Sequence, residues 1–210
     1  MDSTEFAGLL CSRLCHDLVS PVGAINNGVE LIKDPGNADM QEQIIALLSD
    51  SAVQTSNKLK FFRIAFGLGG GLGEELTIEE AKVALSALFD GGKISLEWQH
   101  QQSTLGKDLI KIILNVALTA GEAILGAGTV TIQLPENVDQ ESIIIKAKGS
   151  RMLLAKSVLE AVEGSLNGGG GDTKSIPMIL ASKIGQTRGY SLSLTGNEPE
   201  EISFAISKSE

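Results

Sequence analysis

The sequence predicts an α+β protein with two domains, on three observations. The first 66 residues carry two long helical patterns, residues 67–73 are glycine-rich, and the remainder mixes helical and strand patterns. A purely helical segment followed by one that mixes helices and strands is typical of an α+β chain. The glycine-rich stretch is interpreted as a linker, because it follows a helix and lacks the Lys-Ser/Thr of a phosphate-binding loop. We therefore expect domains at residues 1–68 and 74–210.

The composition is that of an ordinary globular protein. The chain has 210 residues, of which 42% are hydrophobic and 20% charged, which is enough to bury a core. Its net charge of −9 argues against a basic surface for nucleic acid or an anionic membrane. Residues 1–20 lack a signal-peptide pattern, and no run of about 18 apolar residues occurs. We expect a cytoplasmic protein whose partners are other proteins.

The two cysteines are predicted to be packed structural thiols that form no disulfide, because a free cysteine usually behaves as a small hydrophobic residue. Cys11 and Cys15 lie four residues apart on one expected helix, and their free state suits a reducing compartment. Together with His16 they form C-x-x-x-C-H, which is one residue longer than the haem attachment motif. No second cluster of ligands accompanies them, so no metal site is expected.

The first domain is expected to be an antiparallel helical hairpin. One helix runs from the capping-type residues 2–5 to about residue 33, before a break at residues 34–37, and the second spans about 39–66. Apolar residues at steps of three, four and seven form one stripe on each helix: Leu10, Leu14, Leu18, Ile25, Val29 and Ile32 on the first, and Ile44, Leu48, Val53, Leu59, Phe62 and Phe66 on the second. A single hairpin cannot cover both stripes, so we expect a homodimer with a four-helix bundle.

The second domain is expected to place helices on one face of a mixed sheet. Helical patterns are predicted at 77–89, 106–125, 150–164 and 175–187. Strand patterns are predicted at 93–98, 128–134 and 142–148, followed by two final strands that begin near residues 190 and 201.

His16 is the candidate reactive residue. It lies about 200° around the helix from both Leu14 and Leu18, so it should point away from the apolar stripe. A neutral imidazole can offer a nitrogen lone pair to an electrophile. Asp17 could accept a proton or bias the imidazole tautomer, and Arg13 could help to neutralise an anion bound at His16. The predicted contacts of a docked partner are Ser12, Arg13, Val19, Ser20, Gly23 and Asn27.

Pro21 interrupts the helix soon after His16. It removes the backbone bond to the carbonyl of Asp17, which costs about 3 kcal/mol in a helix interior. A bend at this point would open the helix surface for a docking partner. The alternative is an exposed surface histidine beside a tolerated proline.

The stretch "CHDLVSPVGAI" is similar to the phosphoacceptor box of histidine kinases and related phosphotransferases. That box runs His, acidic residue, variable pair, Ser/Thr/Asn, Pro and then small and apolar residues. His16, Asp17, Ser20 and Pro21 occupy the corresponding positions here, followed by residues 22–25. The resemblance implies phosphorylation of His16, with Asp17 assisting proton transfer and Ser20 placed near the phosphoryl group.

Residues 74–210 resemble a degenerate Bergerat-like ATPase domain of the kinase type. The first nucleotide box keeps Asn115 and Ala120 but has Thr119 where the kinases have the Asn that would hold magnesium. In the second box, Ala147 replaces the Asp that reads adenine and Arg151 replaces the last Gly, while Gly149 remains. The glycines at 168–171 are interpreted as a flexible loop. We therefore expect no bound nucleotide.

Over nearly its whole length the chain resembles the alphaproteobacterial histidine phosphotransferases, including "RIAFG" at 63–67 and "LNVALTAGEAI" at 114–124. The resemblance implies a homodimer that receives phosphate from the receiver domain of a hybrid kinase of the CckA type. It would pass the phosphate to response regulators of the CtrA and CpdR type, which control the cell cycle. The partner receiver would supply Mg²⁺, and this chain would bind no cofactor.

Three functions remain to be distinguished. The first is a phosphotransferase that uses His16, Asp17 and Ser20. The second is an ATP-dependent histidine kinase with a divergent nucleotide pocket, and the third is a non-catalytic scaffold that docks on receivers without using His16. The phosphoacceptor box argues against the scaffold, and the altered nucleotide boxes argue against the kinase.

Overall fold

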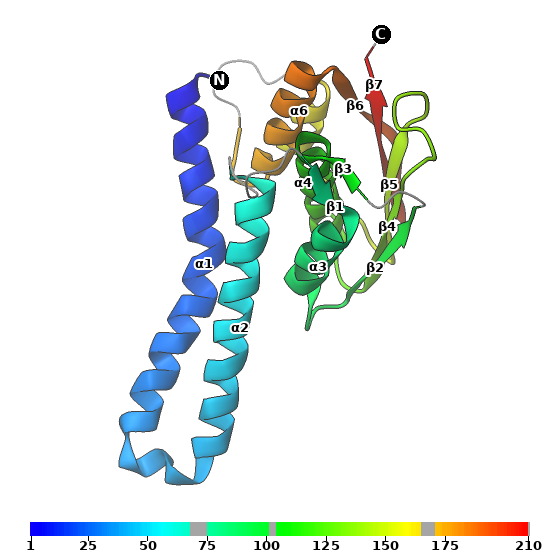
Figure 1. The fold of residues 1–210 in the computed structure, drawn as a ribbon. Coiled ribbons are helices and arrows are strands. Elements are labelled where there is room, and N and C mark those ends of the chain that lie inside the picture. The colour runs from blue at the N-terminus through cyan, green and yellow to red at the C-terminus, as the bar shows by residue number, and fades with distance from the viewer. Residues whose placement is uncertain (68–74, 101–103, 165–170, 210) are drawn as a thin grey trace.

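The computed structural model describes residues 1–67, 75–100, 104–164 and 171–209. A long hairpin stands beside an α/β domain, and its turn extends away from that domain (Figure 1). Helices α1 (Ser3–Lys33) and α2 (Gln41–Ala65) form the hairpin, joined by the 3₁₀-helix η1 (Pro35–Met40). The predicted linker lies, beyond Gly67, outside the described residues. Along the described ranges, no helix is both long and apolar enough to cross a bilayer.

The ends of α1 follow from their local chemistry. The side chain of Asp2 accepts the backbone N–H of Glu5 at 2.8 Å and so caps the first turn. At the other end, Asp34 leaves the helix in an extended conformation, and its side chain accepts the backbone N–H of Gly36 at 2.9 Å. The hairpin and its break at residues 34–37 are thus confirmed.

Only part of the predicted apolar stripes is buried. Ile44 and Phe62 are buried as predicted, but Val53 and Leu59 are about half exposed, at 52% and 51%. The prediction that these two are buried is wrong for the single chain. Exposed apolar side chains continue along the hairpin: Val19, Val22, Val29, Leu31, Ile32, Met40, Ile45 and Leu47.

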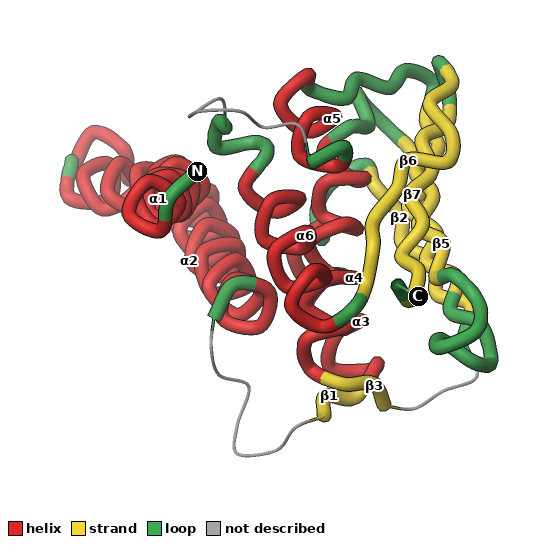
Figure 2. The backbone as a smooth tube through the Cα atoms, turned by 90° about the horizontal axis from the view of Figure 1, so that it is seen from above, coloured by secondary structure: helices red, strands yellow, loops and turns green. Residues whose placement is uncertain are grey.

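The second domain contains a five-stranded mixed sheet, as predicted. Its strand order is β2 (Ile94–Gln99), β4 (Gly128–Gln133), β5 (Ile143–Gly149), β7 (Glu201–Lys208) and β6 (Tyr190–Glu198). The β2–β4 pair is parallel and the other pairs are antiparallel. Helices α3 (Ile78–Phe89), α4 (Lys107–Glu122), α5 (Lys156–Val162) and α6 (Ile176–Arg188) form a layer between the sheet and the hairpin (Figure 2).

Three features of this domain differ from the prediction. Helix α5 begins at Lys156 rather than near residue 150, because the chain before it runs extended: Leu125 N donates to Arg151 O at 2.9 Å and Leu153 N to Ala123 O at 2.8 Å. The same bonds stop α4 at Glu122, three residues earlier than predicted. The short strands β1 (Glu75–Thr77) and β3 (Thr104–Gly106) pair antiparallel, and three residues are too few to show a strand period.

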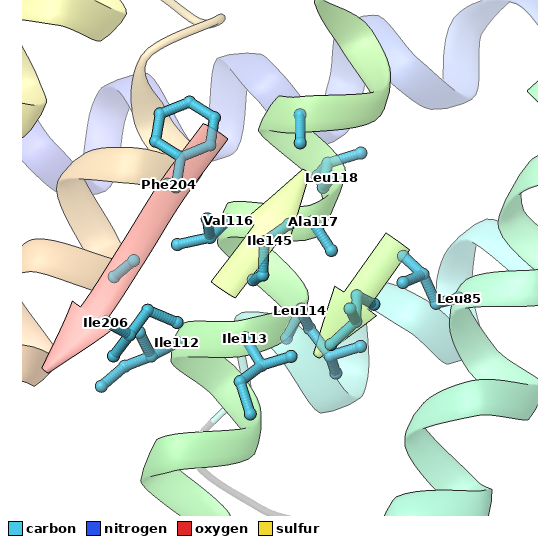
Figure 3. Packing of buried hydrophobic residues seen from close by; sticks show 14 of the residues in the cluster. Leu85, Ile112, Ile113, Leu114, Val116, Ala117, Leu118, Ile145, Phe204 and Ile206 are labelled. Atoms are coloured by element: carbon cyan, nitrogen blue, oxygen red, sulfur yellow. The ribbon is translucent and has the colours of Figure 1, made fainter. Parts of the chain in front are cut away.

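Helix α4 forms the centre of the core. Its residues from Leu109 to Gly121 are buried almost without interruption, and a helix that is apolar all round is typical of a core position. Figure 3 shows side chains of this helix against the sheet, with Ile145 of β5 and Phe204 of β7 among their neighbours. The other side of α4 meets α6 and the end of α2.

Asn115 joins α4 to the hairpin. It is fully buried, and its Nδ2 donates to the carbonyl oxygen of Ala65 at 2.9 Å and to that of Lys111 at 2.8 Å. Thr119 is also buried, and its hydroxyl donates to the carbonyl of Asn115 at 2.9 Å. Both positions of the first nucleotide box therefore make bonds inside the protein.

Replacement of Asn115 should destabilise the protein. Asn115→Ala removes the donor to the carbonyl of Ala65, the last residue of α2, and leaves a small void in the core. We expect the free energy of unfolding, measured by urea denaturation, to fall by about 3 kcal/mol. The exposed control Asn26→Ala should change it by less than about 0.5 kcal/mol. Equal effects of the two substitutions would contradict this role for Asn115.

Candidate functional site

His16 is presented to solvent on α1. Its side chain is 79% exposed, and its Nδ1 lies 3.2 Å from Oδ1 of Asp17, whose own side chain is only 17% exposed. A carboxylate beside Nδ1 favours the tautomer that carries its proton there, because that proton can then be donated. Nε2 is left with a lone pair. The arrangement suits a nucleophilic imidazole.

The Asp17 carboxylate is itself held by Arg13, one turn earlier. Nε of Arg13 donates to Oδ2 of Asp17 at 2.6 Å. Arg13 is only 5% exposed, so the prediction that it lies on the open face is wrong, and its side chain is too buried for the predicted contact with a partner. Its predicted part in neutralising an anion at His16 stays a prediction. Its side chain points toward the second domain, where hydrogen-bond acceptors of that domain bind it.

Arg13 is shared between the two domains. Both oxygens of Glu122, the last residue of α4, accept from its guanidinium: Oε1 from Nη2, and Oε2 from Nη1 at 3.3 Å. The carbonyl of Thr173 also accepts from Nη1, at 3.1 Å. Burial raises the pKa of Glu122 above its usual range, although the charge and hydrogen bonds of Arg13 oppose the shift. Sequence analysis did not select Glu122, because its partner is 109 residues away.

The carbonyl that Pro21 releases is bound by another element. Proline has no N–H to donate to the carbonyl oxygen of Asp17, the residue four positions earlier. Nζ of Lys58, on α2, donates to that oxygen at 2.8 Å. Pro21 itself is buried within a helix that continues to Lys33. The interruption is thus compensated by an ammonium group beside the residue that follows His16.

The other residues predicted to contact a partner lie along α1 at helical spacing from His16. Ser12, Ser20 and Asn27 are exposed, Val19 is 69% exposed, and Gly23 is half-buried. Side chains at steps of four and seven residues share one helix face. Their contact with a partner remains a prediction.

A cleft of about 340 Å³ lies beside His16, between α1 and the second domain. Arg13, His16 and Asp17 line one side, and the opposite side is largely apolar: Leu125, Leu153, Leu154, Ala155 and Val158. Leu153 is 63% exposed. Sequence analysis missed this surface, because apolar residues in short connections carry no periodic signal.

The second nucleotide box lies within and after β5. Ala147 is buried in that strand opposite Ile202 of β7, and Gly149 ends the strand. Among the described residues, no group of three or more His, Cys, Asp or Glu side chains could hold a metal ion. The glycines at 168–170 lie outside the described ranges.

The comparisons with known proteins agree on one family. The family model "Histidine phosphotransferase C-terminal domain" matches residues 78–200. The protein phosphotransferase ChpT of Brucella abortus (strain 2308) is 31% identical over 205 residues, which are 98% of this chain and 96% of that protein. The chain belongs to the histidine phosphotransferases.

A solved structure supports this assignment at the level of the whole chain. A bacterial phosphotransferase determined at 1.7 Å aligns with a TM-score of 0.84 and 29% identity, covering 98% of this chain and 97% of that one. The predicted α+β class, with an N-terminal helical hairpin and a C-terminal layer of helices on a sheet, is confirmed. As a histidine phosphotransferase, the chain is a protein phosphotransferase.

Substitutions of Lys58 and Pro21, alone and together, test whether Lys58 replaces the hydrogen bond that Pro21 removes. Lys58→Met should lower the free energy of unfolding by about 1.5 kcal/mol in urea denaturation, because a buried acceptor loses a charged donor. In a Pro21→Ala background the restored backbone N–H can bind the same carbonyl, so the loss should shrink to about 0.5 kcal/mol. Lys60→Met, on the exposed side of α2, is the control. The same loss in both backgrounds would contradict the compensation.

Proposed function

We propose that this phosphotransferase carries phosphate on His16 within a phosphorelay, between the receiver domain of a hybrid kinase and those of response regulators. The observation that carries the proposal is the exposed imidazole whose Nδ1 faces the Asp17 carboxylate. Family membership supports phosphoryl transfer as the reaction. The phosphoacceptor box and its place on the hairpin support His16 as the residue that performs it.

The chemistry needs one nucleophile and one hydrogen-bond acceptor from this chain. Nε2 of His16 attacks the phosphorus of the receiver's aspartyl phosphate, an N–P bond forms, and the P–O bond to the aspartate breaks to release its carboxylate. The imidazole then carries a positive charge and keeps its proton on Nδ1. Asp17 accepts a hydrogen bond from that N–H, and its negative charge stabilises the imidazolium. In the next transfer, an acceptor receiver's carboxylate attacks the same phosphorus and the N–P bond breaks.

The receiver would dock over His16 on α1. Ser20 would lie near the phosphoryl group, with Ser12, Val19, Gly23 and Asn27 around it. The apolar side of the adjacent cleft, with the exposed Leu153, would contact the flank of the receiver, since a few buried apolar contacts anchor most docking interfaces. Arg13 is not among these contacts.

We also propose that the second domain binds no nucleotide and that Mg²⁺ comes from the receiver. The bonds of Asn115 Nδ2 and the Thr119 hydroxyl support this, because they tie both side chains to backbone carbonyls inside the protein. Oδ1 of Asn115 is buried and makes no hydrogen bond within the described residues. The resemblance favours a CckA-type donor and CtrA- or CpdR-type acceptors in cell-cycle control. Both cysteines are free but exposed, so the prediction that they are packed is wrong. A cytoplasmic location suits free thiols.

A paired labelling assay tests this function. Wild-type protein should take up label from a radiolabelled phosphorylated receiver domain and none from radiolabelled ATP alone, whereas His16→Ala should take up label from neither. His100→Ala is the matched control and should behave as wild type. Label from ATP alone would indicate a histidine kinase, and no label from either source would favour a docking scaffold.

We propose that a second copy covers the exposed apolar face of the hairpin and completes a four-helix bundle. Exposed apolar side chains on both helices support this, since a bundle buries such side chains at its centre. The end of the hairpin that carries the turn extends beyond the second domain (Figure 1).

Light scattering tests the dimer. The wild type should have twice the mass of the chain at micromolar concentration, and the double substitution Ile45→Asp and Val53→Asp should give the monomer mass, because each carboxylate would be buried without a partner. Gln54→Asp adds one carboxylate to the same helix outside the apolar set and should leave the dimer intact. A monomeric wild type would overturn the proposal.

A further inference from the structure

The second domain reaches the phosphoacceptor through a chain of hydrogen bonds. Glu122, at the end of α4, binds both Nη atoms of Arg13 through its two oxygens. Arg13 Nε donates to Oδ2 of Asp17 at 2.6 Å, and Oδ1 of Asp17 lies 3.2 Å from Nδ1 of His16. Arg13 and Asp17, the two inner members of this relay, thus each use different atoms for their two neighbours.

This division of atoms has a physical consequence. A guanidinium is planar and rigid, so a partner that holds both Nη atoms also fixes the direction of the Nε–H bond. In the structure Arg13 binds Glu122 and the Thr173 carbonyl through its Nη atoms, and it binds Asp17 through Nε at Oδ2 alone. One carboxylate oxygen of Asp17 is therefore left for His16.

Without Glu122, the guanidinium loses the partner that holds its Nη atoms. Asp17 is the nearby carboxylate on the same helix, one turn away, and carboxylates commonly bind arginine through both oxygens. Arg13 would then engage both oxygens of Asp17 and withdraw Oδ1 from Nδ1 of His16. The imidazole would lose the acceptor that holds its proton on Nδ1 and so leaves Nε2 with a lone pair.

We propose that Glu122 is a positioning residue for phosphoryl transfer at His16, acting through Arg13 to keep one oxygen of Asp17 against the imidazole. This inference rests on the proposed function and assigns the second domain a part in the reaction. Glu122 touches no reacting atom, so its effect must pass through Asp17.

A double-mutant cycle with Asp17 tests this dependence. Glu122→Gln keeps the shape of the side chain and should slow transfer from a phosphorylated receiver about tenfold, because the nucleophile is misoriented. Asp17→Asn should slow transfer about a hundredfold. In the Asp17→Asn background, Glu122→Gln should have no further effect on the rate. Independent, multiplying effects would overturn the proposal, as would a wild-type rate for Glu122→Gln.

The tautomer of His16 provides a readout that a purely structural role would not move. The chain has two histidines, so long-range ¹H–¹⁵N NMR can observe both imidazoles, with His100→Gln assigning the signals. At a pH where the ring is neutral, the wild type should carry its proton mainly on Nδ1. In Glu122→Gln the majority should shift to the Nε2-protonated form of a free imidazole. An unchanged tautomer would overturn the proposal.

Two further variants separate positioning from stability. Arg13→Lys keeps the charge but lacks the planar fork that binds Glu122 through both Nη atoms and fixes the Nε–H bond toward Asp17, so it should reproduce the slower transfer and the altered tautomer. Asp108→Asn breaks a matched ion pair with Arg188, whose Nε lies 2.6 Å from Oδ2 of Asp108 at the other end of α4. That end is about 21 Å from Glu122 along the helix, and the substitution should change neither readout.

The proposed function and this inference fail separately. Retention of label by His16→Ala would remove the proposed carrier and the inference with it. Loss of label in His16→Ala, combined with normal transfer and a normal tautomer in Glu122→Gln, would leave the carrier intact and reject the role of Glu122. Thermal unfolding of each variant, compared with Asp108→Asn, confirms that the assays compare folded proteins.

Discussion

The buried guanidinium of Arg13 is the interaction on which the arrangement of the site depends. A charge removed from water must be paired, because an unpaired one costs many kcal/mol. Arg13 finds its partners on both domains: Asp17 on its own helix, and Glu122 and the Thr173 carbonyl on the second domain. The hairpin and the second domain are therefore joined at the point where His16 is presented, and the surroundings of the imidazole depend on both.

Helix α1 has a buried face and an exposed face with different roles. One face turns Arg13 and Pro21 inward, and the other exposes His16 and the residues spaced one turn apart from it. Pro21 would leave a carbonyl without its helical donor, but Lys58 supplies one from α2. The missing helical hydrogen bond is thus replaced by one within the hairpin. The exposed face of α1 keeps the regular helical spacing that a docking partner would contact.

Much of the fold follows from the sequence, because helical and strand periods are local properties. The hairpin, the order of elements and the mixed sheet were predicted from such patterns. The burial of Arg13, the role of Glu122 and the late start of α5 were not, since each depends on contacts between distant segments. The exposure of Val53 has the same origin, because a stripe shows only that a surface is apolar, and its cover can come from outside the chain. His16 was predicted from its motif and its helical position, which are both local.

The central claim is that phosphate resides on a ring nitrogen of His16. Its most direct test is ³¹P NMR of the protein after transfer from a phosphorylated receiver, for wild type and His16→Gln. The account predicts one phosphoramidate signal in the wild type, labile in acid and stable in alkali, and no such signal in His16→Gln. A phosphoester signal, or a phosphoramidate that persists in His16→Gln and so lies on His100, the second of the two histidines, would contradict it.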